Sequence, residues 1–207
     1  MKKRRCVLGN IFYVMGKSSS GKDTIYNMLL NDKELGLKNI VGYTTRPKRE
    51  GEENGREYIF VDENELDELK KQEKVIESRV YNTIYGKWYY FTVNDEQVNL
   101  KQYNYILIGT LESYEKVRDF YGTDESGKRI VVPIYINVED GERLLRAIER
   151  EKGQNTPKYA EMCRRFLADS EDFSEEKIKK AEIGIIYEND ILKNCYDKIR
   201  KDIKKYI

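Results

Sequence analysis

The sequence has no histidine among its 207 residues. Histidine is the most common general base, a member of the Ser/His/Asp class of hydrolase and a usual ligand of transition metals. Its absence excludes that hydrolase class and most transition-metal sites. Any chemistry must therefore rest on lysine, arginine, carboxylates and backbone amides.

Cysteines and long apolar runs are scarce as well. Cys6, Cys163 and Cys195 are too few and too scattered for a disulfide framework or a zinc knuckle, so we expect free thiols. No run approaches the roughly 18 apolar residues of a membrane span. The apolar stretch after the basic N-terminus is short and is broken at Gly9 and Asn10, which does not suit a signal peptide. We therefore expect a soluble, cytoplasmic protein.

Neither sign of charge dominates the chain. Its 38 lysine and arginine residues stand against 37 acidic ones, which gives a formal net charge of +1. A chain without a global basic field does not attract nucleic acid or an anionic membrane, so we expect neither as a partner. Any phosphate binding must be local, and the length suits one large domain with a sizeable core.

Four short apolar runs have the composition of buried strands. The first is β-branched and aromatic and ends at Gly16, as a buried strand does when it enters a loop. Helical patterns follow these runs, and such alternation is typical of βαβ units. The sequence therefore predicts an α/β fold with a parallel sheet flanked by helices. The strand candidates are residues 11–15, 105–108, 130–136 and 183–187.

Two of the helical patterns make specific predictions. After the third run, Asn137 is expected to cap a helix together with Asp140, three residues further on. The apolar face of that helix would carry Leu144, Leu145 and Ile148. A terminal helix is predicted by apolar residues at every fourth position, namely Ile191, Cys195, Ile199 and Ile203.

The pattern changes between Ile40 and Val93. Short runs rich in Tyr, Phe and Val are separated there by turn sequences such as Glu53-Asn54-Gly55. This indicates an inserted, mixed or partly antiparallel module, placed at residues 39–93. The polar stretch 151–158 lies between two helical patterns and is either part of a mobile lid or a simple connector.

Residues 16–22 have the GxxxxGK spacing of a phosphate-binding loop. Glycines let the loop turn its N–H groups toward phosphate oxygens, the following helix adds the positive end of its dipole, and Lys22 reaches the β and γ oxygens. A Gly/Ser turn without chemical meaning is the alternative, which the flanking strand and helix disfavour. The ATP-binding candidates here are Gly16, Ser18, Ser19, Ser20, Gly21, Lys22, Asp23 and Thr24.

Residues 44–58 resemble the monophosphate-binding pattern TTRxxRxGExxGxxY of guanylate kinases. Arg46 and Arg49 supply planar forks that can grip a phosphate, and Tyr58 can donate a phenolic hydrogen bond to the same oxygens. A solvated basic loop is the alternative. The resemblance continues in order along nearly the whole chain. It assigns Glu77 to the N1 and N2 edge of guanine and Tyr85 to the monophosphate.

Near the C-terminus the resemblance implies a lid with catalytic arginines. Arg146 and Arg150 align with lid residues, and Arg165 belongs to an arginine pair on the next helix. Together with Lys22 they would neutralise the phosphoryl group during transfer. The resemblance also places Asn189 near the adenine of ATP. Arg146 and Arg150 could equally form salt bridges with Glu142 and Glu149, and Asn189 could belong to a turn.

The resemblance implies a fold and an activity. The fold would be a P-loop NTPase-type core at residues 6–38, 94–142 and 166–207, with the insertion at 39–93 and a small lid at 143–165, all in one domain spanning 1–207. The activity would be phosphorylation of a nucleoside monophosphate in purine metabolism, with GMP or dGMP as the expected substrate. ATP would be the co-substrate and Mg²⁺ the cofactor.

Several positions depart from the family pattern, and they concern the base and the metal. Gly42 stands where the family has a guanine-contacting Ser, and Lys87 where a Ser or Thr follows Tyr-Gly. An expected Asp-Ile-Asp is missing at Gly109, which removes a carboxylate for the guanine amino group and another near Mg²⁺. Two other functions therefore stay open: a kinase for a different (deoxy)nucleoside monophosphate, and an inactive module that binds phosphorylated peptides.

The candidate metal ligands are Asp23, Thr24 and Glu52. Asp23 follows Lys22 where Ser or Thr is usual, and a carboxylate among phosphate oxygens is repelled unless a cation lies between them. Asp23 could instead be a favourable charge at a helix N-terminus. Glu52 could also replace the missing metal-binding carboxylate, a suggestion that rests on its position alone.

Replacing Asp23 by Asn separates these two roles of the carboxylate. If Asp23 binds Mg²⁺, directly or through water, Asp23→Asn raises the Mg²⁺ concentration needed for half-maximal turnover, because the amide is a weaker ligand for a hard cation. Turnover is measured across a Mg²⁺ titration. An unchanged Mg²⁺ dependence would contradict the metal role and leave only the helix-terminal one.

Overall fold

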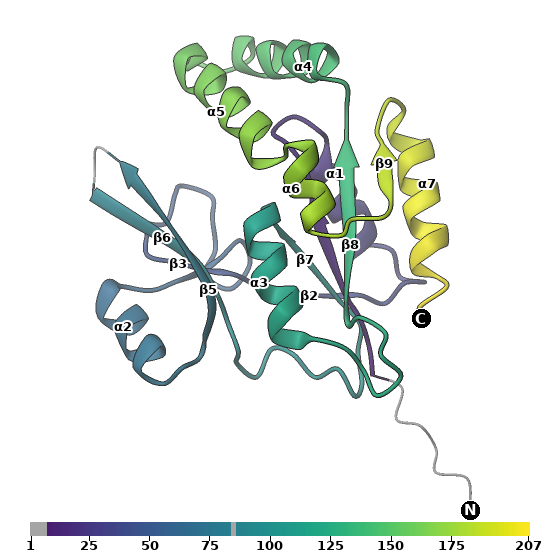
Figure 1. Ribbon diagram of the computed structural model, residues 1–207. Coiled ribbons are helices and arrows are strands. Elements are labelled where there is room, and N and C mark those ends of the chain that lie inside the picture. Colours follow the sequence, from purple (N-terminus) through teal and green to yellow (C-terminus); the bar gives the residue numbers. More distant parts are fainter. Residues whose placement is uncertain (1–7, 84–85) are drawn as a thin grey trace, which may run out of the picture.

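The computed structural model describes residues 8–83 and 86–207 (Figure 1). In chain order the elements are β1 (Ile11–Met15), α1 (Lys22–Leu30), β2 (Lys38–Asn39), β3 (Tyr43–Thr44), β4 (Ile59–Phe60), α2 (Glu63–Lys71), β5 (Val75–Thr83), β6 (Gly86–Val93), β7 (Tyr105–Gly109), α3 (Leu111–Tyr121), β8 (Val131–Asn137), α4 (Asp140–Lys152), α5 (Tyr159–Asp172), α6 (Glu175–Lys180), β9 (Ile186–Glu188) and α7 (Leu192–Ile203).

A parallel five-stranded sheet forms the core, in the order β2-β7-β1-β8-β9. All five side chains of β1 are buried, because this central strand is covered on both faces. Ile11, Tyr13 and Met15 face a cluster that includes residues of α3. Phe12 and Val14 face the opposite cluster, to which α1 and α7 contribute. The α/β fold with helices on both faces is therefore confirmed.

A second sheet, in the order β4-β3-β6-β5, lies beside the core (Figure 1). It is mixed, since β3 pairs in parallel with β4 but β6 runs antiparallel to both β3 and β5. Helix α2 covers it through Leu66, which packs on Phe91 and Val93. Asp62 and Glu65 form a capping box at the start of α2. The predicted mixed module between the first and second parts of the core is thus present.

Two connecting segments join this sheet to the core and are bonded to each other. The backbone N–H of Val41 donates to Gln97 Oε1 (2.9 Å), and Gln97 Nε2 donates back to the Val41 carbonyl (3.3 Å). The side-chain amide thereby replaces the partner that a neighbouring strand would supply. The Tyr43 hydroxyl adds a 2.7 Å hydrogen bond to Asp95 Oδ2. These bonds hold the two connections together where the small sheet leaves the core.

Helices α4 and α5 pack against each other and extend beyond the end of the core sheet (Figure 1). The expected cap of α4 is wrong: Glu139 is the N-cap and accepts from the Glu142 N–H at 3.0 Å, because β8 continues through Asn137. Its expected apolar face is wrong at Leu145, which is 59 % exposed. The buried positions include Arg143 and Ala147, because the guanidinium has partners inside the structure.

The C-terminal unit differs from its prediction at both ends. The last strand is β9, Ile186–Glu188, and Ile183 lies before it in an irregular segment that still buries the side chain. Ile191 is 60 % exposed because it is the N-cap of α7 and precedes its first turn. Cys195, Ile199 and Ile203 form the buried face as predicted. Cys163 and Cys195 are free thiols, and Cys6 lies outside the described residues.

Within residues 8–83 and 86–207, no helix is both long and apolar enough to cross a membrane.

Asp32 connects the end of α1 with α7 through a charged cluster. Its Oδ2 accepts from Arg200 Nε (2.5 Å) and the Tyr196 hydroxyl (2.8 Å), and its Oδ1 accepts from the Glu34 N–H (2.9 Å). Partial burial acts to raise the pKa of Asp32, but these hydrogen bonds outweigh it and lower the pKa from 3.8 to about 2. The folded state therefore favours the charged carboxylate.

Replacing Asp32 by Asn should lower the free energy of unfolding by about 1–2 kcal/mol near neutral pH. Because the folded pKa is depressed, this contribution is complete above the ordinary carboxyl pKa and disappears as the pH falls from about 4 to about 2. Urea unfolding of both proteins between pH 2.5 and 7 measures it. Asp197→Asn, an exposed change on α7, is the control. A difference that stays constant with pH would contradict this account.

Candidate active site

The loop from Gly16 to Lys22 leaves the central strand β1 at its carboxyl end and leads into α1. A Cβ at Gly16 would meet the Ile136 carbonyl oxygen at 2.4 Å, so the backbone passes too close to β8 for any side chain. Gly21 has φ 80°, the left-handed region that glycine adopts without strain. Ser19 shares this region at φ 63°. These conformations curl the loop around the N-terminus of α1, as the sequence predicts.

Asn189 fixes the loop from the end of β9. It is 2 % exposed, and its Nδ2 donates to the Ser20 carbonyl at 2.8 Å. Its backbone carbonyl accepts from Arg146 Nη2 at 3.2 Å. The side chain and the backbone of Asn189 thereby join the loop and helix α4 to the segment after β9. The hydroxyls of Ser19 and Ser20 are buried without a hydrogen-bond partner among the described residues.

Lys22 and Asp23 form an ion pair at the start of α1. Lys22 Nζ lies 3.2 Å from Asp23 Oδ2, and the Asp23 side chain is 76 % exposed. Thr24 is exposed beside it. Across the described parts of the chain, no three acidic, cysteine or histidine side chains gather in a way that could hold a metal ion.

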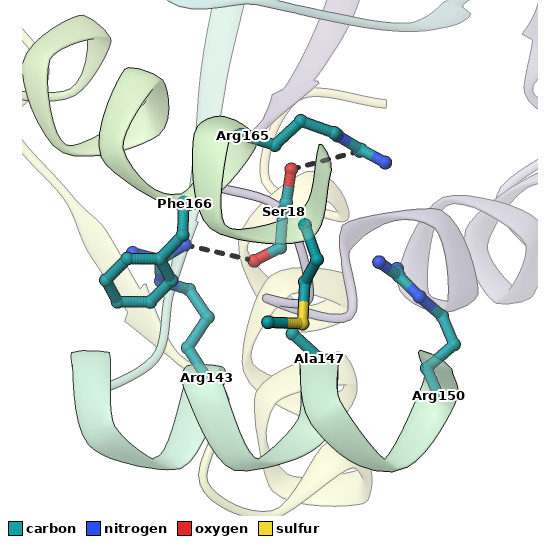
Figure 2. Close-up of a pocket in the computed structure, with 7 residues that line it drawn as sticks. Ser18, Arg143, Ala147, Arg150, Arg165 and Phe166 are labelled. Atoms are coloured by element: carbon teal, nitrogen blue, oxygen red, sulfur yellow. Dashed lines mark hydrogen bonds between the residues drawn. The ribbon is translucent and has the colours of Figure 1, made fainter. Parts of the chain in front are cut away.

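Helix α5 contacts the loop at Ser18 (Figure 2). Arg165 Nη2 donates to the Ser18 hydroxyl at 3.1 Å, and the Ser18 backbone N–H donates to Asp169 Oδ2 at 2.7 Å. The structure therefore brings one predicted arginine, Arg165, directly to the loop. The carboxylate of Asp169 accepts a backbone N–H of the kind that a phosphate oxygen accepts in such loops.

Arg143 is buried between α4, α5 and the loop, with 1 % of its surface exposed. Its Nε and Nη2 donate to Asp140 Oδ1 at 3.1 and 3.0 Å, and its Nη1 lies 3.4 Å from the Ser18 carbonyl oxygen and 3.5 Å from Asp169 Oδ2. The guanidinium also stacks over Phe166, with 3.9 Å from Cζ to the ring centre. This arginine fixes the lid helices on the loop.

The other two predicted lid arginines lie on α4. Arg146 forms the foreseen pair with Glu142 (2.9 Å) in addition to its bond to Asn189. Arg150 lies 3.9 Å from Glu151. Arg150 also lines a small cavity in front of the loop, shown in Figure 2, whose other lining residues are Ser18, Arg143, Ala147, Met162, Arg165 and Phe166.

Arg46, of the second motif, is 3 % exposed and is held by a carboxylate. Its Nη1 and Nη2 donate to the two oxygens of Glu52 at 2.7 and 2.6 Å, and Glu52 also accepts from the Arg49 backbone N–H. Hydrogen bonds from Arg46 lower the pKa of Glu52 to about 2 against the effect of burial. The side chain of Arg49 is exposed. Glu52, predicted as a metal ligand, is therefore already engaged as the partner of Arg46.

Tyr58, the last residue of the second motif, is in contact with Arg46 of the same motif and lies in the field of charges from β5 and α1. Burial raises the pKa of Tyr58, and the charges that act on its hydroxyl include Arg79 of β5, Arg46 of the second motif and Asp23 of α1. The Arg46 guanidinium lies 5.3 Å from the Tyr58 ring centre. Asp23, beside the first predicted motif, therefore acts electrostatically on Tyr58, which belongs to the second.

Glu77, on β5, is completely buried and fully paired. Its carboxylate accepts from Arg79 Nε (3.1 Å), Arg79 Nη2 (3.3 Å) and the Thr92 hydroxyl (2.8 Å). Sequence reasoning missed Arg79, although its place two residues after Glu77 on a strand puts both side chains on one face. It also missed Arg143 and Asp169, which only the packing of α4 and α5 brings to the loop. Tyr85 lies outside the described residues.

A β1–loop–α1 unit at the centre of a parallel sheet, closed by arginines from two further helices, defines a P-loop protein of the kind that binds nucleotide phosphates. Comparison with known protein families identifies the family within this class. The guanylate kinase family model matches residues 9–206, so the chain belongs to the guanylate kinase family.

Individual relatives agree with the family. A guanylate kinase of Neisseria meningitidis serogroup A is 38 % identical over 114 residues, 54 % of this chain and 53 % of that protein, so the chain spans about half the length of this relative. One of Porphyromonas gingivalis is 26 % identical over 207 residues, 95 % of this chain and 97 % of that protein. The crystal structure of guanylate kinase from Anaplasma phagocytophilum shares the fold, with a TM-score of 0.62 at 20 % identity, covering 96 % of this chain and 86 % of that one.

Truncation of Arg143 should loosen the lid from the loop. Arg143→Ala leaves Asp169 without its buried counter-charge, whereas Asp140 keeps Lys17 at 3.1 Å. We therefore expect a loss of about 3 kcal/mol in the free energy of unfolding and weaker ATP binding. Chemical denaturation and calorimetric titration with ATP measure both. Leu145→Ala, an exposed change on the same helix, is the control. Equal effects of the two substitutions would contradict the role of Arg143.

Proposed function

We propose that this chain is an ATP-dependent nucleoside monophosphate kinase that converts GMP or dGMP to the diphosphate. The observation that carries the proposal is the contact between Arg165 and Ser18, which places a lid arginine at the phosphate loop. An arginine there can neutralise a phosphoryl group held by the loop. The relatives from Neisseria meningitidis and Porphyromonas gingivalis are named guanylate kinase, which supports the same reaction.

On the ATP side, the backbone N–H groups of residues 16–22 and the helix N-terminus would hold the β and γ phosphates. Lys22 would break its ion pair with Asp23 and contact the transferred phosphoryl group. Arg146, Arg150 and Arg165 would approach the same group from the lid. Asp169 must release the Ser18 N–H if a phosphate oxygen takes it, and Arg143 remains as its counter-charge. Asn189 would hold the loop in shape beneath the nucleotide.

On the acceptor side, Arg46, Arg49, Tyr58 and Tyr85 would hold the monophosphate, and Glu77 would lie at the base. Arg46 is oriented by Glu52, so its guanidinium is ordered before the nucleotide arrives. Arg49 is exposed and unhindered at the edge of the same loop. The reaction needs no histidine, because phosphoryl transfer depends on positioning and on stabilisation of charge.

The proposal includes Mg²⁺ with ATP. The residues present fit such an ion in part: Asp23 offers an exposed carboxylate next to the loop lysine, with the Thr24 hydroxyl beside it, whereas both oxygens of Glu52 are taken by Arg46. When bound, Mg²⁺ neutralises charge on the phosphate oxygens. We therefore place it with Asp23 and Thr24 and leave Glu52 as a positioning residue for Arg46.

The proposal also covers organisation and location. The chain would work as one domain in which residues 39–93 and 143–165 close over the core, with the Val41–Gln97 pair at the base of the first moving part. Its substrates are small nucleotides rather than nucleic acid or a membrane, and it would act in the cytoplasm, where ATP is supplied. An inactive peptide-binding module is disfavoured, because such a module has no use for the loop and its lid arginines.

Incubation of the protein with Mg²⁺-ATP and each of GMP, dGMP, AMP, UMP, CMP and dTMP tests the proposal through diphosphate formation. We expect turnover of GMP or dGMP, and a loss of about 10²–10³-fold in kcat for Lys22→Met, because a charge that stabilises the transition state is removed. Lys33→Met, an exposed change after α1, should be silent. Binding of ATP without turnover of any monophosphate would contradict the proposal, and turnover of AMP or a pyrimidine nucleotide alone would overturn the choice of GMP.

A further inference from the structure

A buried polar cluster lies where β5 meets the end of β7 and the start of α3. Arg79 joins its parts: the side of its guanidinium with Nε and Nη2 faces Glu77, and Nη1 points the other way and lies 3.4 Å from the Thr110 hydroxyl. Because Thr110 is the N-cap of α3, this contact links the small sheet to the core. The cluster therefore lies at the junction that separates the two motifs of the site.

Glu77 cannot serve as a free acceptor in this arrangement. Its side chain has no exposed surface, and each of its oxygens already accepts at least one hydrogen bond from Arg79 or Thr92. Because nothing of the carboxylate is exposed, a ligand N–H could reach it only if the buried pair moved, and such pairs are costly to disrupt. The group that this pair presents to a ligand is the arginine, whose N–H groups are all donors.

No second carboxylate is available from β7. At Gly109 an added Cβ would lie 2.1 Å from the Tyr13 hydroxyl, so that hydroxyl fills the space in which a side chain at this position would begin. Burial raises the pKa of Tyr13, and Arg79 and Ser113 act in the opposite direction. Tyr13 is therefore neutral at physiological pH. The cluster therefore offers the hydroxyls of Tyr13 and Thr110 and the guanidinium of Arg79. The N1 and N2 edge of guanine, which carries donors, would need carboxylates instead.

Arg79 also faces the acceptor side of the site. It is the cross-strand partner of Tyr90 on β6, and the Tyr90 ring centre lies 5.5 Å from that of Tyr58. Its side chain is 19 % exposed, whereas that of Glu77 is fully covered. A nucleotide whose phosphate lies at Arg46 and Tyr58 therefore has Arg79, and not Glu77, as the accessible charged group beyond them.

We propose that Arg79 reads the 6-oxo group of a purine and that the 2-amino group goes unread, so the substrates are 6-oxopurine nucleoside monophosphates, IMP as well as GMP. This inference rests on the proposed kinase function. A carbonyl oxygen facing Arg79 accepts its hydrogen bond, whereas the 6-amino group of adenine sets donor against donor. A 2-amino group without a dedicated acceptor adds little discrimination.

Four substrates separate the two groups: GMP has both the 6-oxo and the 2-amino group, IMP only the 6-oxo, 2-aminopurine riboside monophosphate only the 2-amino, and AMP neither. With Mg²⁺-ATP, we expect kcat/KM for IMP within about tenfold of GMP. We expect values at least about 100-fold lower for the two substrates without the 6-oxo group, because Arg79 is then left without its acceptor. A more than 100-fold preference for GMP over IMP would overturn the inference and leave the kinase proposal intact, whereas no turnover of any of the four would refute the kinase proposal itself.

Substitution at Arg79 tests the residue. The double variant Arg79→Met with Glu77→Gln removes both charges of the buried pair together, which avoids an unpaired carboxylate. We expect its preference for 6-oxo substrates to fall below about tenfold. Arg79→Lys should keep part of that preference, and Arg200→Lys, on the distant helix α7, should keep all of it. An undiminished 6-oxo preference in the double variant would overturn the role of Arg79, and the wild-type comparison of GMP with IMP decides the substrate class if this variant does not fold.

Discussion

The structure depends on one constraint: the backbone of the loop after β1 is curled inward, and its polar groups must find partners. Buried N–H and C=O groups are costly when unpaired, and the internal hydrogen bond from the Ser20 N–H to the Lys17 carbonyl (3.2 Å) leaves the Ser18 N–H and the Ser20 carbonyl to find partners elsewhere. Asn189 therefore takes the Ser20 carbonyl, and Asp169 takes the Ser18 N–H. These two contacts bring the last strand and the lid to the loop. The arrangement of the C-terminal third of the chain follows from them.

Carboxylates hold the arginines of the site in the same way. Arg46 lies on Glu52, Arg79 on Glu77, and Arg143 between Asp140 and Asp169. Each pair orders a long side chain before a ligand arrives, which reduces the entropy lost on binding. The arginines of the site are consequently ordered without a ligand. Under the proposed function, Glu52 and Asp169 would compete with the phosphates for their partners.

The sequence predicted best where one local pattern decides the structure. The strand at 11–15, the loop at 16–22 and the buried face at Cys195, Ile199 and Ile203 follow from hydrophobic periodicity and glycine placement. It failed where tertiary contacts decide. Asn137 is not a cap because β8 continues through it, and Leu145 is exposed because the buried face of α4 accommodates Arg143. The contacts of Arg143 with Ser18 and Asp169 could not be foreseen, since no local pattern specifies how α4 and α5 pack on the loop. The pair of Glu77 and Arg79 could have been foreseen, because residues two apart on a strand share one face.

Amide hydrogen exchange with and without Mg²⁺-ATP tests the central claim, that the curled loop is the phosphate site and that the lid is bonded to it. Peptides from residues 16–24 and from α5 should become protected together when ATP binds, because phosphate and lid meet at Ser18. Adenosine, which lacks phosphates, should protect neither. Protection elsewhere with these two segments unchanged would contradict the account.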